Sequence, residues 1–143
     1  MDEKPLYERC LTVVGGNFDN AGEASAGIKA ILRQMGFSSD VVRKAALVAY
    51  ESEINIVSYA RRGMLRLHVV PGSVMIEAID EGPGIPDIEL AMQPGYSTAS
   101  AKVREMGFGA GMGLCNIKSF SDMFKISSEV GRGTYLKMII KSA

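Results

Sequence analysis

The sequence contains only a single histidine and two cysteines, and this scarcity argues against two classes of protein. Cys10 and Cys115 have no metal-binding spacing and form no disulfide framework, so we expect small side chains that are buried or half-buried. His68 lies in the alternating run MLRLHVV, on the face opposite the apolar residues of that run, which favours a surface histidine. Neither a zinc site nor an enzyme that phosphorylates its own histidine is expected.

Long apolar runs and an excess of charge are also missing. No segment approaches the roughly 18 apolar residues of a membrane span, and the N-terminal MDEKPLYERC lacks the apolar core of a secretory signal. The formal net charge is zero, which gives no support for nucleic-acid binding. We therefore expect one cytoplasmic domain over residues 1–143, with neither a nucleic-acid nor a membrane partner.

The apolar periodicity predicts an ordered series of helices and strands. In chain order we expect a strand at 6–14, helices at about 28–35 and 38–60, a hairpin of strands at 64–70 and 73–80, helices at 87–92 and 113–122, and a hairpin at 124–130 and 135–140. This order predicts an α/β (α+β) two-layer sandwich, in which three helices cover one face of a mixed, largely antiparallel sheet. Residues 93–112 show no steady period, and a connection of this length is usually functional or disordered.

The segment ESEIN places Glu51 and Asn55 four residues apart inside the long helix, so both side chains share a face. The neighbouring Val48 and Ile54 are expected to face the core, which puts the carboxylate and the amide near the buried side. A carboxylate can take a proton from a hydroxyl, and an amide oxygen is a suitable ligand for Mg²⁺. The alternative is an ordinary solvated helix face.

The segment DEGPG places Asp80, Gly82 and Gly84 directly after a predicted strand. An aspartate at a strand end can accept a hydrogen bond from an exocyclic amine such as that of adenine. Glycines two residues apart let the backbone lie against a flat ring. A plain tight turn is the alternative, since Asp, Pro and Gly all favour turns.

The run GFGAGMG, residues 107–113, opens a predicted helix. Repeated glycine frees the backbone to wrap a phosphate chain, and the helix start adds unpaired N–H groups. The spacing matches neither the dinucleotide fingerprint nor the Walker loop. A flexible loop without function would have a similar composition.

Taken in order, these three segments and the final GRGT resemble the GHKL ATPase superfamily, and within it the switch-type serine/threonine kinases and anti-sigma regulatory factors of bacteria. The resemblance runs from about Asp40 to the C-terminus and more loosely through the first strand and helix. It implies Glu51 as catalytic base, Asn55 as Mg²⁺ ligand, and an ATP lid at about 93–112. The residues that it assigns to ATP are Asn55, Asp80, Gly82, Gly84, Gly109, Gly111, Gly113 and Thr134.

Two features of the lid depart from these relatives. Phe108 and Gly109 stand where anti-sigma members carry a Glu-Arg pair, which weakens a sigma-factor-binding interpretation more than ATP binding. The stretch 99–106 is longer than in the switch kinases, and its Lys102 and Arg104 could reach a γ-phosphate or simply be solvated. Cys115 follows the last glycine at the helix start, where a redox role is a further alternative.

Two functions follow from the resemblance. The first is a serine/threonine protein kinase that uses Mg-ATP to phosphorylate a partner with a STAS, anti-anti-sigma-type domain. The segment NIVSYA, which begins at Asn55, and GYST at residues 95–98 favour it. The alternative is an ATP-gated, anti-sigma-like regulator that binds its partner without transferring phosphate. A homodimer is compatible with both. A motor or chaperone clamp is disfavoured because no second domain is predicted to transmit the work.

Overall fold

The computed structural model describes residues 5–94 and 113–142, so most of the predicted lid lies outside the described residues. The elements are β1 Tyr7–Val14, η1 Phe18–Asn20, α1 Glu23–Gln34, α2 Ser39–Tyr59, β2 Arg62–Val70, β3 Ser73–Glu81, α3 Ile88–Ala91, α5 Gly113–Phe120, β4 Met123–Glu129 and β5 Gly133–Lys141. Every predicted helix and strand is found, and their order is confirmed.

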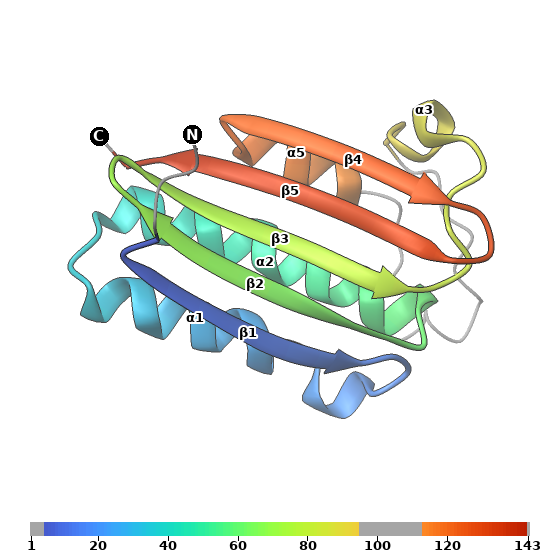
Figure 1. Cartoon of the computed structure of the whole chain (residues 1–143), viewed down its shortest axis with the longest axis horizontal. Helices are drawn as coiled ribbons and strands as arrows, with labels where there is room; N and C mark the ends of the chain where they lie inside the picture. Colours follow the sequence, from blue (N-terminus) through green and yellow to red (C-terminus); the bar gives the residue numbers. More distant parts are fainter. Residues whose placement is uncertain (1–4, 95–112, 143) are drawn as a thin grey trace.

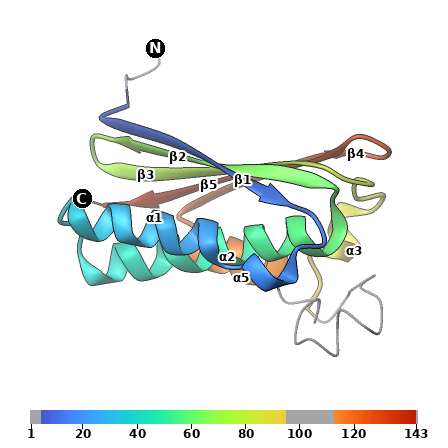
Figure 2. The same cartoon turned by 90° about the horizontal axis from the view of Figure 1, so that it is seen from below.

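The five strands form one sheet in the order β1-β2-β3-β5-β4, and all of their pairings are antiparallel. Helices α1, α2 and α5 lie together on one face of this sheet, as Figures 1 and 2 show. The predicted two-layer architecture is therefore confirmed, and the predicted mixed character reduces to purely antiparallel pairing among the described strands.

The core lies between the two layers and is centred on α2. Alternate residues of β2, β3 and β5 point into it, because successive side chains of a strand face opposite sides of the sheet. Leu65, Ile76 and Met138 from these strands are 0% exposed, as is Val48 of α2. This packing fixes which face of α2 meets the sheet, and so where its polar side chains must lie.

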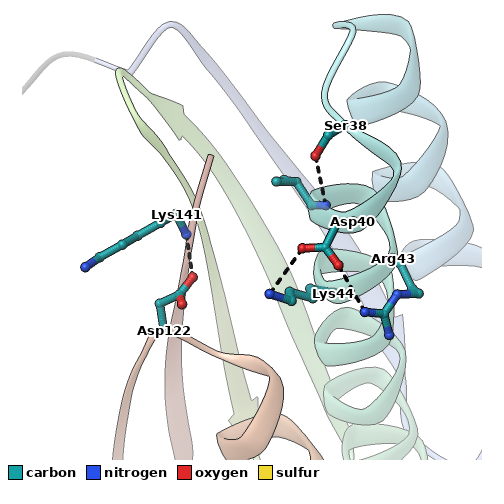
Figure 3. A network of polar contacts seen from close by, with 7 residues as sticks. Ser38, Asp40, Arg43, Lys44, Asp122 and Lys141 are labelled. Carbon is teal, nitrogen blue, oxygen red and sulfur yellow. Dashed lines mark hydrogen bonds and ion pairs between the residues drawn. The ribbon is translucent and has the colours of Figure 1, made fainter. Parts of the chain in front are cut away.

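The start of α2 has one side-chain cap and two exposed ion pairs, as Figure 3 shows. Ser38 accepts a hydrogen bond of 3.3 Å from the backbone N–H of Val41. Asp40 pairs with Arg43 at 3.1 Å and with Lys44 at 3.2 Å, and these exposed pairs each contribute little to stability. This end of α2 is the one remote from Glu51 and Asn55.

The face of the sheet opposite the helices carries a charged row rather than an apolar one. His68 lies there between two carboxylates, with Nδ1 2.9 Å from Glu8 and Nε2 2.8 Å from Glu77. Tyr135 also donates a hydrogen bond to Glu77. The predicted face of His68 is right, but the prediction of a surface side chain is wrong, because these neighbours leave it only 9% exposed.

The two cysteines differ in exposure. Cys10 is exposed on β1, contrary to our expectation, whereas Cys115 is half-buried as expected. Within residues 5–94 and 113–142, no helix is both long enough and apolar enough to cross a membrane.

Candidate functional site

Glu51 and Asn55 lie on successive turns of α2, and the start of α5 packs directly against them. A Cβ atom placed on Gly113 would lie 3.2 Å from Glu51 Oε2 and 3.2 Å from Asn55 Oδ1. Glycine at this position therefore lets the start of α5 approach the two oxygen atoms more closely than a residue with a side chain could. Three residues that the sequence predicts for one site are brought together here.

The carboxylate of Glu51 is half-buried, and its environment alters its proton affinity. Burial raises the pKa of Glu51, while a hydrogen bond from the side chain of Asn116 opposes that rise. Asn116 stands one turn after Gly113 on α5, so the same helix supplies both the close approach at Gly113 and the amide. We call Glu51, Asn55, Gly113 and Asn116 the helix cluster.

Glu53, between Glu51 and Asn55 in the ESEIN segment, has a different task. Its carboxylate is 2% exposed and accepts the backbone N–H groups of Gly22, Ala24 and Ser25 at 2.9, 3.2 and 2.8 Å. These N–H groups begin α1, which has no side-chain cap of its own. A carboxylate at that position satisfies donors that the helix leaves unpaired and complements its dipole. Glu53 thereby fastens α1 to α2.

Asp80 lies near the end of β3 and continues the alternation of Ile76 and Ala78, so its side chain is on the face that the helices cover. Its Oδ1 accepts a hydrogen bond of 3.0 Å from the backbone N–H of Thr134. Burial raises the pKa of Asp80, and the backbone N–H groups of Thr134 and Gly82 oppose the rise. The carboxylate is thus held in place by backbone donors.

The glycines around Asp80 allow the backbone of two loops to meet. Gly84 has a φ of +76°, and a Cβ atom there would lie 2.4 Å from the carbonyl oxygen of Glu129. A Cβ on Gly133 would lie 2.0 Å from the carbonyl oxygen of Asp80. Neither position has room for a side chain, so the β3–α3 loop and the β4–β5 hairpin are in direct backbone contact.

Ser128 joins the same two segments, and nothing in the sequence singled it out. Its hydroxyl accepts the backbone N–H of Ile85 at 2.7 Å and lies 3.1 Å from the carbonyl oxygen of Gly133 and 2.9 Å from Thr134 Oγ1. We call the set around it the strand-end cluster; its members are Asp80, Gly82, Gly84, Ser128, Gly133 and Thr134.

The strand-end cluster and the helix cluster lie at the same end of the molecule. A Cβ on Gly82 would lie 3.1 Å from the Cβ of Ala60, the residue that follows α2. A hollow of about 350 Å³ borders the strand ends, with Asp80 and Thr134 in its wall. Ile79 and Tyr135 also line it, and they belong to the face away from the helices, so this hollow extends beyond the cluster itself.

The two ends of the segment that contains the predicted lid meet in space. The Sγ of Cys115, in the first turn of α5, donates a hydrogen bond of 2.6 Å to the carbonyl oxygen of Met92, which ends α3. Cys115 therefore has a structural contact that sequence reasoning missed. Gly109, Gly111, Lys102 and Arg104, which the sequence assigns to phosphate binding, lie outside the described residues.

The sequence and the fold of this chain are both similar to those of known proteins. A sequence model of the family described as "Histidine kinase-like ATPase domain" matches residues 17–140. A chain of the crystal structure of the SiaB–SiaC complex from Pseudomonas aeruginosa superposes with a TM-score of 0.62 and covers 92% of this chain and 89% of its own. At 14% identity, this second likeness shows the fold alone.

Two curated relatives are similar in sequence as well. An anti-sigma F factor of Caldanaerobacter subterraneus is 35% identical over 100 residues, which cover 70% of this chain but only 62% of that relative. The serine/threonine-protein kinase RsbT of Bacillus subtilis is 33% identical over 115 residues, which cover 76% of this chain and 79% of the kinase. The chain therefore belongs to the histidine kinase-like ATPase domain family, an ATP-binding family in which its relatives include anti-sigma F factors and a serine/threonine-protein kinase.

Proposed function

We propose that this chain is a serine/threonine protein kinase that transfers the γ-phosphate of Mg-ATP to a partner protein with a STAS, anti-anti-sigma-type domain. The observation that carries the proposal is the position of Gly113, whose lack of a side chain brings the start of α5 against the oxygens of Glu51 and Asn55. A phosphate chain can approach a helix start that carries no side chain at this point.

In this proposal the strand-end cluster recognises the nucleotide base. The carboxylate of Asp80 accepts a hydrogen bond from the exocyclic amine of adenine, and Thr134 supports that carboxylate through its backbone N–H. Gly82 and Gly84 shape the floor beneath the ring. The glycine run that ends at Gly113 wraps the phosphates, with Gly109, Gly111 and Lys102 contributing from outside the described residues.

We assign the Mg²⁺ ligand to Asn55. Its Oδ1 lies close to the Cβ position of Gly113, as does Glu51 Oε2, and an amide oxygen beside a carboxylate is a donor set that suits a hard cation. Mg²⁺ takes few protein ligands and fills the rest of its shell with water and phosphate oxygens. When bound, it would neutralise charge on the phosphates.

Glu51 is the proposed general base. The hydroxyl oxygen of a serine or threonine on the partner forms a bond to the γ-phosphorus, the bond from that phosphorus to the β,γ-bridging oxygen breaks, and ADP leaves. Glu51 takes the hydroxyl proton. Burial, which raises the pKa of Glu51, makes its carboxylate a better proton acceptor than an exposed one.

The test is incubation of the protein with Mg-ATP and purified STAS-domain proteins, followed by mass analysis of phosphopeptides. We expect one phosphoserine or phosphothreonine on a partner, and a loss of at least about 100-fold in rate for Glu51→Gln. Lys118→Ala, an exposed substitution on α5, is the matched control and should transfer at the rate of the unaltered protein. Transfer that persists in Glu51→Gln would contradict the role of Glu51.

The similarity to anti-sigma F factors favours a second candidate, an ATP-gated regulator that binds its partner without transferring phosphate. This version needs the strand-end cluster but not Glu51. Calorimetric titration of a partner with and without Mg-ATP separates the two functions. An affinity that depends on ATP, together with no phosphate on the partner, would support the second candidate.

A further inference from the structure

The hydroxyl of Ser128 is the centre of a small hydrogen-bond network at the strand ends. Ser128 pairs with Thr134 across β4 and β5, so both side chains lie on the face that the helices cover. Within hydrogen-bond distance of its oxygen are the backbone N–H of Ile85 at 2.7 Å, the carbonyl oxygen of Gly133 at 3.1 Å and Thr134 Oγ1 at 2.9 Å. No role for this serine follows from the motifs in the sequence.

Only one arrangement of hydrogen atoms satisfies all three contacts. A serine hydroxyl has one proton to donate and two lone pairs to accept with. The N–H of Ile85 occupies one lone pair, and the carbonyl of Gly133 can only accept, so the serine proton must point at Gly133. The proton of the third contact must then come from Thr134. If Ser128 donated to Thr134 instead, its bond to Gly133 would be lost.

The direction of that third bond determines what Thr134 can offer to a ligand. Because its proton is directed at Ser128, the hydroxyl of Thr134 presents only lone pairs on its other sides. The neighbouring carboxylate of Asp80 already accepts the backbone N–H of Thr134 and is likewise an acceptor. The Asp80 carboxylate and the Thr134 hydroxyl therefore both offer hydrogen-bond acceptors to a bound base. An acceptor atom of the base that faced them would have no donor to pair with.

We propose that Ser128 is a specificity-determining residue, which holds the Thr134 hydroxyl as an acceptor and so selects a purine with an amino group at position 6. This rests on the proposed function and adds to it a residue and a direction of hydrogen bonding. A purine with a carbonyl at position 6 would bring an acceptor against acceptors. A buried polar atom without a partner is costly, so such a base is rejected.

The test compares ATP with inosine triphosphate, in which a carbonyl replaces the 6-amino group. Titration calorimetry on the unaltered protein should give an affinity ratio of at least about 10 in favour of ATP. In Ser128→Ala the Thr134 hydroxyl is free to rotate and donate to the carbonyl. We expect the ratio to fall by about fivefold, and Ser128→Thr, which keeps a hydroxyl, should restore it.

A second background separates this effect from a general loosening of the loop. In Thr134→Val no hydroxyl remains to rotate, so adding Ser128→Ala should leave the ratio unchanged. The proposal is overturned if Ser128→Ala weakens both nucleotides equally, or if it changes the ratio as much in the Thr134→Val background. If the unaltered protein binds neither nucleotide, the proposed function itself fails. If the unaltered protein binds ATP but Ser128→Ala leaves the ratio of ATP affinity to inosine triphosphate affinity unchanged, only the role of Ser128 is refuted.

Discussion

The strand-end cluster and the helix cluster lie at one end of the molecule but are held in place by different interactions. The strand-end cluster is fixed by hydrogen bonds and by backbone contacts that exclude any side chain at Gly84 and Gly133. The helix cluster depends on the packing of α5 against α2, and Glu51 takes a hydrogen bond from Asn116. The geometry of the strand-end cluster is therefore set by backbone contacts and hydrogen bonds, and that of the helix cluster by the packing of α5 against α2.

This difference suggests that the strand-end cluster serves ligand recognition and the helix cluster serves catalysis. Groups that recognise a ligand gain affinity from being preorganised, because less freedom is lost on binding. A catalytic carboxylate gains from partial burial, which costs stability but adjusts its proton affinity. We therefore expect substitutions in the strand-end cluster to affect folding and ATP affinity, and substitutions in the helix cluster to affect the rate and its pH dependence.

The largest expected effect is on the free energy of unfolding of Gly133→Ala. A Cβ there would lie 2.0 Å from the carbonyl oxygen of Asp80, so backbone must move, and we expect a loss of about 3 kcal/mol or more. Gly131→Ala is the matched control, because Gly131 also has a positive φ but nothing within 4 Å of its Cβ position. It should lose about 1 kcal/mol. Equal losses in urea denaturation would show that the backbone contact is not tight.

The second prediction compares the two carboxylates directly. Asp80→Ala removes the acceptor of the Thr134 N–H and of the base, and we expect ATP affinity to fall about 100-fold. Glu51→Ala should change ATP affinity by less than about threefold, since its proposed partner is the attacking hydroxyl. Calorimetric titration with Mg-ATP measures both. A comparable loss of affinity in the two variants would contradict the division between the clusters.

Most of the fold was predictable because its signals are local. Among the described residues, apolar alternation and helical periodicity predicted every α-helix and strand, although not the short 3-10 helix η1. The burial of His68 was not predictable. It depends on carboxylates from β1 and β3, whose register against β2 is set by the tertiary structure.

The candidate site was predictable only where it follows a motif. Asp80, Thr134 and the pair of Glu51 and Asn55 were identified from the resemblance of their segments to a known family. Ser128 and Asn116 carry no such signal. A serine in an alternating strand looks like any solvated residue, and its partner on the β3–α3 loop, Ile85, is 43 positions away in sequence.

The third prediction concerns stability against pH. Because burial raises the pKa of Glu51 above its ordinary 4.5, the folded state binds this proton more tightly than the unfolded state. The free energy of unfolding contributed by Glu51 therefore falls as pH rises through the interval between those two pKa values. Glu51→Gln should be more stable than the unaltered protein at pH 7, by less than about 1 kcal/mol because the group is only half-buried.

The gain from Glu51→Gln should vanish as the pH is lowered below the ordinary carboxyl value of 4.5. Glu53→Gln is the matched control, since Glu53 accepts three backbone N–H groups and an amide would turn one acceptor into a donor. It should lose about 2 kcal/mol at pH 7. Urea denaturation at pH 7 and pH 4 checks both variants. A loss of stability in Glu51→Gln at pH 7 would indicate that Glu51 is also structural.

The smallest expected effect belongs to Asn116→Ala. The amide of Asn116 stabilises the charged form of Glu51, so its removal should raise the pKa of Glu51 further. A base must be deprotonated to act, and the rate of phosphoryl transfer should therefore begin to fall at a higher pH as the solution is acidified. On that acidic limb we expect a loss of about threefold, with little change at higher pH.

The ATP affinity of Asn116→Ala is the control measurement for this small effect on the rate. Asn116 contacts Glu51, the proposed general base, which lies outside the strand-end cluster. The Asn116→Ala variant should therefore bind ATP within about twofold of the unaltered protein. Lys118→Ala, two residues further along α5 and exposed, should change neither the affinity nor the pH profile. A uniform loss of rate at every pH would mean that Asn116 acts through the packing of α5, and the helix cluster would then depend on its fold as much as the strand-end cluster does.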